Sequence, residues 1–182
     1  MTEVSVILIT GLPGTGKTTL ARRIAGHHRL PLISKDLIKE PLLDVLGARD
    51  AGQSRQLSDA SFAVLFAIAR ELVEAGASFV LEGNFRAGEH EVLLRQALGT
   101  ASLAQVLCRV SETVRIARLS ARELDSSRHV GHRLGEKQSV SAVRCTDEFL
   151  DLTSARFIHE GLEAHPVPAG LDDWMKLRAK SL

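Results

Sequence analysis

Short apolar runs alternate with segments of helical periodicity along the chain. Four runs predict strands, Val4–Thr10, Leu30–Ser34, Ser78–Glu82 and Leu103–Val110, and a weaker fifth run, interrupted by two prolines, is His165–Ala169. Such alternation is typical of βαβ units, which form a parallel sheet with helices on both faces. The expected fold class is therefore α/β, with three layers.

Helices are predicted between these strands. The clearest one lies between the second and third strands, where apolar residues recur at three- and four-residue spacing and Gly76 is placed to end the helix. The segment from Asp36 to Leu46 is also helical in pattern, but we expect Pro41 to interrupt it and to start a second short helix. Ser111 is a candidate N-cap for a helix that runs to about Glu123.

The chain beyond that helix differs in composition. Residues 123–137 contain few apolar side chains and are predicted to form a short lid. A further helix should follow, with apolar residues facing inward, and a short amphipathic segment around Trp174 should end the chain. The inward-facing residues of the further helix are Val143, Phe149, Leu150 and Leu152. Because the 182 residues contain no linker or repeat, we expect residues 1–182 to form a single domain.

A glycine-rich motif joins the first strand to the first helix. Residues 11–18, GLPGTGKT, match G-x-x-x-x-G-K-[ST], and an apolar strand precedes them while a helical pattern follows. In such a loop the glycines let backbone N–H groups turn toward phosphate oxygens, and the helix N-terminus adds about half a positive charge. We expect Lys17 to reach the β- and γ-phosphates of ATP and Thr18 to bind Mg²⁺. The predicted nucleotide-binding residues here are Gly11, Pro13, Gly14, Thr15, Gly16, Lys17, Thr18 and Thr19.

Other positions distinguish the classes of P-loop protein. The D-x-x-G and N-K-x-D motifs of GTPases are absent from the expected positions, whereas Asp36 follows the second strand. Because the carboxyl ends of parallel strands meet at one edge of the sheet, Asp36 should lie near the P-loop. A carboxylate there can accept the proton of an attacking hydroxyl, so Asp36 is the predicted catalytic base; a helix N-cap is the alternative. Glu82, at the end of the third strand, is predicted to hold Mg²⁺ through water.

Candidate acceptor ligands lie close to these carboxylates in the sequence. Asn84 and Arg86 follow Glu82, and Lys39 follows Asp36 by three residues. We predict that Asp36, Lys39, Asn84 and Arg86 contact the acceptor. Turn formation at Asn84 and a solvated surface lysine are the alternatives.

Arginines are concentrated after the fourth strand. Arg115, Arg118 and Arg122 are spaced three and four residues apart, so they fall within roughly a 60° arc of one helix face. Arg128 and Arg133 follow in the predicted lid, with His129 and His132 between and beside them. Guanidinium groups suit the charge that spreads over a transferring phosphoryl group. We therefore predict Arg118 and Arg122 as catalytic residues that also bind ATP, together with Arg128; a solvated helix face is the alternative.

The net charge, hydropathy and cysteine content limit the kinds of binding partner that we expect. The net charge of +1 favours neither nucleic acid nor a membrane surface, and no apolar run approaches the roughly 20 residues that span a bilayer. The two cysteines, Cys108 and Cys145, lack Cys-x-x-Cys spacing and are expected to be reduced thiols. We expect a cytoplasmic protein, monomeric or homodimeric, that does not bind nucleic acid.

On these motifs the chain resembles a group of P-loop kinases that includes chloramphenicol phosphotransferase, polynucleotide 5′-kinase, gluconate and shikimate kinases and zeta toxins. The shared features are residues 11–18, 34–39 and 82–84, and Arg118-Leu119-x-x-Arg122 leading to residues 128–132. The resemblance implies a five-stranded parallel sheet in the order 2-3-1-4-5, an arginine lid and Asp36 as the base. Glu82 replaces the commoner aspartate and Lys39 a commoner arginine, which leaves the acceptor open.

The expected function is transfer of the γ-phosphoryl group of ATP, with Mg²⁺, to a hydroxyl of a small molecule. One alternative is a polynucleotide or nucleotide kinase, which would need aromatic side chains for base stacking. The chain has no tyrosine, and Phe85 is the only aromatic residue near the predicted rim. A second alternative is a regulatory or toxin-like ATP-binding module without metabolite kinase activity.

Overall fold

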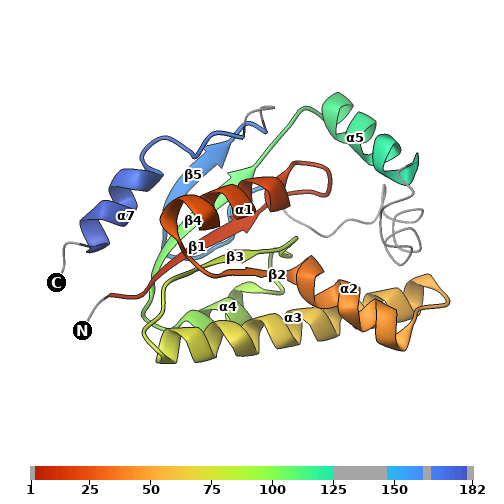
Figure 1. Ribbon diagram of the computed structural model, residues 1–182, viewed down its shortest axis with the longest axis horizontal. Coiled ribbons are helices and arrows are strands. Elements are labelled where there is room, and N and C mark those ends of the chain that lie inside the picture. The colour runs from red at the N-terminus through yellow and green to blue at the C-terminus, as the bar shows by residue number, and fades with distance from the viewer. Residues whose placement is uncertain (1–2, 125–146, 162–164, 180–182) are drawn as a thin grey trace.

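A computed structural model describes residues 3–124, 147–161 and 165–179 of the chain, without the side chains of residues 122–124 and 179. Its strands form one parallel sheet in the order β2-β3-β1-β4-β5 (Figure 1). The strands are β1 (Ser5–Thr10), β2 (Leu32–Ser34), β3 (Phe79–Glu82), β4 (Ser102–Cys108) and β5 (Ala155–His159). The predicted fold class and strand order are confirmed.

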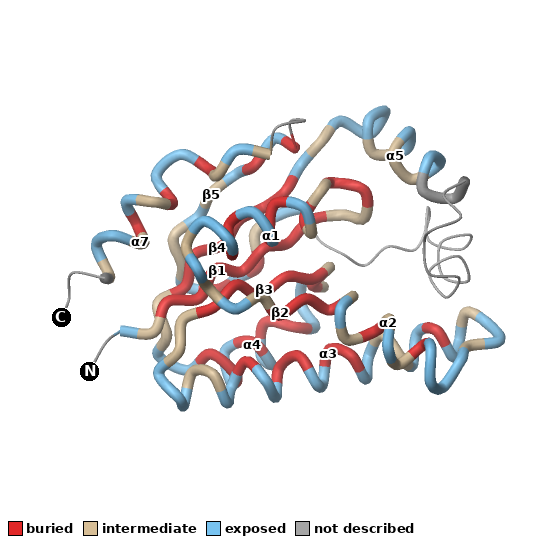
Figure 2. The backbone as a smooth tube through the Cα atoms, in the orientation of Figure 1, coloured by how far each residue is buried: buried red, intermediate tan, exposed pale blue. Residues whose placement is uncertain are grey.

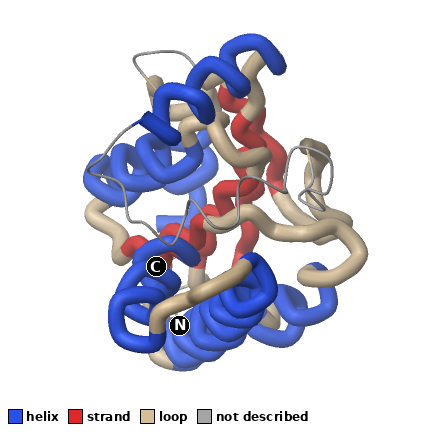
Figure 3. Tube along the Cα trace, turned by 90° about the vertical axis from the view of Figure 1, so that its right-hand side faces the viewer, coloured by secondary structure: helices blue, strands red, loops and turns tan. Residues whose placement is uncertain are grey.

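Helices cover both faces of this sheet (Figures 1 and 3). The described helices are α1 (Lys17–His28), α2 (Lys35–Leu46), α3 (Ala51–Glu74), α4 (Glu91–Leu98), α5 (Glu112–Leu124) and α7 (Leu171–Ala179). Leu65 of α3 and Leu94 of α4 pack in the core on one face, and Ile24 of α1 and Trp174 of α7 pack in the core on the other. The molecule therefore has three layers, α/β/α.

The central strand β1 explains why the phosphate-binding motif is rigidly placed. All six residues of β1 are buried, and the strand pairs with β3 on one side and β4 on the other (Figure 2). Val6 and Leu8 face one core, and Ile7 and Ile9 face the other. A strand covered on both faces reads as a continuous apolar run, which is why its sequence does not alternate.

The last strand lies earlier in the chain than predicted. The structure places β5 at Ala155–His159, paired with β4, so the predicted strand at His165–Ala169 is wrong. Pro166 and Pro168 cannot donate backbone hydrogen bonds to a sheet. The burial of β5 alternates along the strand, but the apolar Ile158 lies on its exposed side, so the sequence of β5 does not alternate between apolar and polar residues and gave no clear strand signal.

Two helix predictions also need correction. Pro41 lies inside a continuous α2, because losing one backbone donor is tolerated where the helix packs against α3. The helix predicted over Phe149–Leu152 is absent from the described residues 147–154, which form bends and irregular backbone. The side chain of Gln105 in β4 bonds both the N–H of Leu150 (3.0 Å) and its carbonyl oxygen (3.1 Å), which replaces helical hydrogen bonds. Leu150 is buried as predicted, although not by a helix; Val143 lies outside the described residues.

Other local predictions agree with the structure. The hydroxyl of Ser111 accepts a hydrogen bond from the N–H of Val114 (3.4 Å) at the start of α5, and α3 ends two residues before Gly76. The thiol of Cys108 is buried, which raises its pKa to about 12, whereas Cys145 lies outside the described residues. Most of the predicted lid, and Arg128, Arg133, His129 and His132 with it, also lies outside them. None of the described helices is both long and apolar enough to span a membrane.

Candidate active site

The P-loop connects β1 to α1 in a conformation that only its glycines allow at two points. Gly16 has φ 90°, and a Cβ there would lie 2.5 Å from Cε1 of His165. A Cβ on Gly11 would collide with the carbonyl oxygen of Cys108 in β4. The hydroxyl of Thr15 donates to the carbonyl oxygen of Leu12 (2.8 Å), which closes the turn. The sequence motif thus forms the compact turn that it predicts.

The N-terminus of α1 meets the requirements of an anion site. Gly16 is the N-cap residue and supplies no side-chain acceptor, so the first N–H groups of α1 keep their capacity to bind an anion. Lys17 is buried, and its ammonium group donates to the carbonyl oxygen of Leu12 (3.1 Å). An ammonium group has three donors, so this contact leaves capacity for a phosphate. Thr19, another predicted ligand, is exposed at this end of the helix.

Glu82 meets the P-loop at the end of β3. Its Oε2 lies 3.4 Å from the hydroxyl of Thr18 and accepts a hydrogen bond from the hydroxyl of Ser34 (2.6 Å). Glu82 is buried, and this burial raises the pKa of its carboxyl group, while the nearby charge of Lys17 and the hydrogen bond from Ser34 act in the opposite direction. Oxygen ligands at one point, with an ammonium group beside them, suit Mg²⁺ bound together with a phosphate.

Asp36 lies in the first turn of α2, beyond the end of β2. Its Oδ1 lies 3.1 Å from the ammonium group of Lys35, and its side chain is 43% exposed. The charge of Asp36 contributes to the raised pKa of Glu82, so the two carboxylates interact electrostatically. The N-cap of α2 is Ser34, and the alternative role of Asp36 as the N-cap is therefore wrong. A partly exposed carboxylate on this rim can contact a substrate.

Helix α5 lies directly against the P-loop. A Cβ built on Gly14 would lie 3.1 Å from Cγ of Arg115 and 3.2 Å from Cγ of Leu119. Arg118 donates from Nη2 to the carbonyl oxygen of Gly161 (3.0 Å), and its Nη1 is buried without a hydrogen-bond partner among the described residues. Because a buried guanidinium donor needs an acceptor, this Nη1 is available to an anion such as a phosphate.

The other predicted arginines differ from Arg118. Arg115 pairs with Glu112 of its own helix (3.2 Å). The backbone of Arg122 lies in α5, but its side chain, like the whole of Arg128, is outside the described residues. The structure therefore brings Arg118 to the P-loop and leaves the other two predicted ATP ligands of this group as predictions.

The loop between β5 and α7 also reaches the P-loop, which the sequence analysis missed. Gly161 lies so close to Thr15 that a Cβ there would be 3.2 Å from the Thr15 carbonyl oxygen. His165 lies against Gly16 with φ 41°, and its Nδ1 is 3.2 Å from Nε2 of the buried His159. Burial lowers the pKa of both histidines, which favours their neutral forms. The proline pair that follows His165 was the signal for such a loop.

Lys39, one of the predicted acceptor ligands, is held by a contact between two helices. Lys39 is buried, and its ammonium group donates to the hydroxyl of Ser54 in α3 (3.0 Å). Burial, with the charge of Lys35, lowers the pKa of Lys39 to about 8. Asn84 is partly buried at the end of β3. The contact between Lys39 and Ser54 crosses from α2 to α3, and it was not visible in the sequence.

Arg86 is engaged by two carboxylates. Its guanidinium group donates to Asp59 of α3 (2.8 Å) and to Glu89 (2.5 Å), and these contacts raise the pKa of Arg86 against the effect of burial. The group also lies 5.9 Å from the ring centre of Phe62. An arginine held in this way positions the loop after β3, and a contact between Arg86 and the acceptor stays a prediction.

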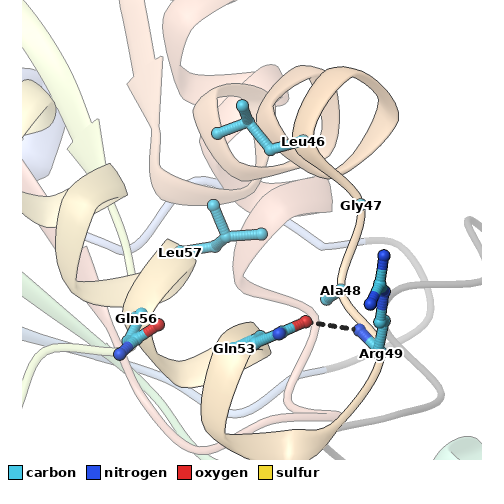
Figure 4. Close-up of a pocket in the computed structure, with 7 residues that line it drawn as sticks. All are labelled: Leu46, Gly47, Ala48, Arg49, Gln53, Gln56 and Leu57. Carbon is cyan, nitrogen blue, oxygen red and sulfur yellow. Dashed lines mark hydrogen bonds between the residues drawn. The ribbon is translucent and has the colours of Figure 1, made fainter.

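A pocket of about 480 Å³ lies at the connection between α2 and α3 (Figure 4). Its lining residues are Leu46, Gly47, Ala48, Arg49, Gln53, Gln56 and Leu57. The N–H of Arg49 donates to Oε1 of Gln53 (2.8 Å), which is the hydrogen bond drawn in the figure. None of the predicted site residues lines this pocket, so we assign it no part in the candidate site.

The sheet order and the P-loop beside Glu82 define a P-loop protein with the fold of a kinase. The chain belongs to an AAA domain family, AAA_33, whose model matches residues 6–140. No curated protein sequence matches the chain.

Solved structures with the same fold include several kinases. A "putative kinase" from Chloroflexus aurantiacus is 27% identical, with a TM-score of 0.85, and the match covers 97% of this chain and 98% of that one. A sugar kinase from Janibacter sp. HTCC2649 is 15% identical, with a TM-score of 0.56 and coverage of 97% and 94%. A gluconokinase from Sinorhizobium meliloti 1021 is 16% identical, with a TM-score of 0.51 and coverage of 87% and 84%. The last two likenesses concern the fold alone, and together the findings support the resemblance to P-loop kinases.

Proposed function

We propose that the protein is a kinase that transfers the γ-phosphoryl group of ATP to a hydroxyl group of a small molecule, with Mg²⁺. The observation that carries this proposal is the position of Glu82. A buried carboxylate lies 3.4 Å from the Thr18 hydroxyl at the start of the P-loop helix, with the charge of Lys17 close enough to act on its pKa. Next to a phosphate loop, a hydroxyl can bind Mg²⁺·ATP directly and a carboxylate can hold the ion through a bound water.

In this proposal each residue has a distinct task. The N–H groups of residues 11–19, except Pro13, which has none, and the ammonium group of Lys17 would bind the phosphates. Thr18 would bind Mg²⁺ directly and Glu82 through water, and the ion would neutralise phosphate charge. Asp36 takes the proton of the acceptor hydroxyl. The oxygen of that hydroxyl forms a bond to the γ-phosphorus, and the bond between the γ-phosphorus and the bridging oxygen of ADP breaks. Arg118 offers its unpartnered Nη1 to the charge on the transferring group. Arg122 and Arg128 are proposed to act with it.

A small acceptor is favoured over a nucleic acid. Phe85, the aromatic residue that the sequence places nearest the rim, is fully buried and lies beside Phe62, Phe66 and His90. It therefore offers no surface on which a base could stack. The proposed acceptor contacts are Asp36, Lys39, Asn84 and Arg86, and we propose a cytoplasmic monomer or homodimer.

The test identifies the acceptor directly. Purified protein is incubated with Mg²⁺ and γ-labelled ATP in a metabolite extract, and any labelled product is identified. The Asp36→Asn variant should bind ATP as the unchanged protein does but should lose transfer, by about 100-fold or more for removal of a general base. Asp44→Asn, on the exposed side of the same helix, is the matched control and should keep full transfer. If no metabolite is labelled, or if Asp36→Asn transfers at the normal rate, the proposal is wrong.

A further inference from the structure

Three side chains with metal-binding atoms meet at the end of α1 that is remote from the P-loop. His27 and His28 form the last turn of α1, and Asp172 lies in the first turn of α7. The Nε2 atoms of His27 and His28 lie 3.3 Å and 3.2 Å from the same atom, Oδ1 of Asp172. All the candidate ligand atoms of these residues lie within 4.8 Å of one another.

These separations match those between ligands of one metal ion. Nitrogen and oxygen ligands bind Zn²⁺ at about 2.0–2.1 Å, so two ligands at a tetrahedral angle are about 3.3–3.4 Å apart. The two distances from the histidine nitrogens to Asp172 are 3.3 Å and 3.2 Å. These two separations are therefore already those that an ion requires, whereas the candidate atoms as a set lie within 4.8 Å of one another, so the two histidine rings would have to turn toward a common ion.

Hydrogen bonding does not account for this arrangement. Nε2 of His28 and Oδ1 of Asp172 are both shielded from solvent, and neither has a hydrogen-bond partner in the described parts of the chain, although they are 3.2 Å apart. A donor and an acceptor at that distance would bond if their directions agreed. Buried polar atoms without partners are uncommon and call for an unseen ligand. An unprotonated imidazole nitrogen and a carboxylate oxygen each offer a lone pair, which is what a cation needs.

We propose that His27, His28 and Asp172 bind a divalent transition-metal ion of the zinc class. Imidazole nitrogens select such an ion over Mg²⁺ or Ca²⁺, which prefer oxygen ligands. The site is separate from the one proposed for Mg²⁺·ATP, because the 12 residues of α1 place it about 17 Å along the helix from Lys17. It also joins segments that are distant in sequence, His28 and Asp172. The ion would therefore fasten α7 to the helix that carries the phosphate loop.

The chain carries its own reporter for this site. Trp174, the only tryptophan, lies two residues beyond Asp172 in α7. Binding of Co²⁺, which quenches nearby indole fluorescence, should therefore lower the emission of Trp174. Zn²⁺ should bind in calorimetry with one equivalent assigned to this site. The chain must carry no polyhistidine tag, and ATP and Mg²⁺ are left out so that the P-loop does not contribute.

Matched variants decide whether these three residues are the ligands. Asp172→Asn and His27→Ala should each weaken Zn²⁺ binding and Co²⁺ quenching by at least about 100-fold, since loss of even an outer-shell partner of a metal costs about 10–100-fold. Asp173→Asn removes a neighbouring carboxylate that pairs with Lys176 at 3.4 Å, and it should bind as the unchanged protein does. Other histidines that bind Zn²⁺ weakly are common to all variants and cancel in the comparison.

Folding is monitored separately, and each outcome has one meaning. Because the ligands come together only in the folded chain, Zn²⁺ should raise the Tm of the unchanged protein and of Asp173→Asn, but not that of Asp172→Asn. Circular dichroism without metal shows whether each variant is folded, and His27→Ala, at an exposed residue, serves if Asp172→Asn is not. Unaltered Zn²⁺ binding in both ligand variants would overturn the proposal. Equal losses in Asp173→Asn would overturn it as well, because they would indicate general attraction to acidic surface.

Discussion

Replacing Glu82 with glutamine tests the proposed metal site most directly, because the geometry predicts how large the effect should be. Two oxygen ligands at right angles around one Mg²⁺ ion, each at about 2.1 Å, are about 3.0 Å apart. The hydroxyl of Thr18 and Oε2 of Glu82 are 3.4 Å apart, and the same Oε2 accepts the proton of Ser34 at 2.6 Å. This spacing favours Thr18 as a direct ligand and Glu82 as an acceptor from a water bound to the ion.

An outer-shell role sets the expected magnitude. Loss of such a partner weakens metal affinity or activity by about 10–100-fold, whereas a direct ligand would cost more. Mg²⁺ is titrated by calorimetry into protein saturated with ATP, and Glu82→Gln should need about 10–100-fold more Mg²⁺. Glu91→Gln, at a buried glutamate in the first turn of α4, is the control and should titrate normally. An unchanged Mg²⁺ requirement in Glu82→Gln would refute the assignment.

The same substitution should affect stability in the opposite direction. Burial raises the pKa of Glu82 in the folded chain, so the folded state holds this proton to a higher pH than the unfolded state does. The free energy of unfolding therefore falls as the pH rises from the pKa of Glu82 in the unfolded chain through its higher pKa in the folded chain. Glutamine carries no such charge, and without nucleotide Glu82→Gln should unfold at higher urea than the unchanged protein at pH 8. Weaker Mg²⁺ binding combined with lower stability would instead indicate a damaged fold.

Three further predictions concern the neighbouring charges. Lys17→Ala should weaken ATP binding in calorimetry by about 10-fold or more, as expected for a lost charge-assisted contact, and should abolish transfer; unchanged turnover would contradict the site. Arg118→Ala should lower the transfer rate more than ATP affinity, and equal losses would mean that Arg118 binds only the ground state. The pKa of Lys39 is about 8 in the folded chain and 10.5 in the unfolded chain. Between these two pH values the unfolded chain holds more protons, so the free energy of unfolding should rise with pH there. The gain, on the order of 3 kcal/mol, should be absent from urea unfolding of Lys39→Met, and an equal rise in both proteins would refute the burial argument.

The parts of the fold that were predictable are those in which local pattern and environment agree. Val6 to Ile9 read as a buried strand because helices cover both faces, and the apolar spacing around Phe62 and Leu65 matches the buried side of α3. Where tertiary contacts decide, the prediction failed. Leu150 is apolar and buried like a helix residue, but the amide of Gln105, 45 positions earlier, bonds its backbone in place of a helical turn. No pattern local to Leu150 contains that partner.

In the candidate site, too, contacts set by the strand order were predictable and contacts set by tertiary packing were not. A parallel sheet brings the carboxyl ends of neighbouring strands together, so the strand order already implied that Ser34 of β2 and Glu82 of β3 would be adjacent, as their pairing in the sheet confirms. The contact between Ser34 and Glu82 was therefore predictable from sequence. The burial of Lys39 was not, because it depends on where α3 crosses α2 and presents Ser54. Nor was the approach of His165 to Gly16, since a loop with φ 41° at a non-glycine residue is held by the contacts around it rather than by its own sequence. The ends of the strands thus determine where the proposed carboxylates lie. The crossings of helices and the loops determine which side chains surround these carboxylates, and those surrounding side chains must select the acceptor.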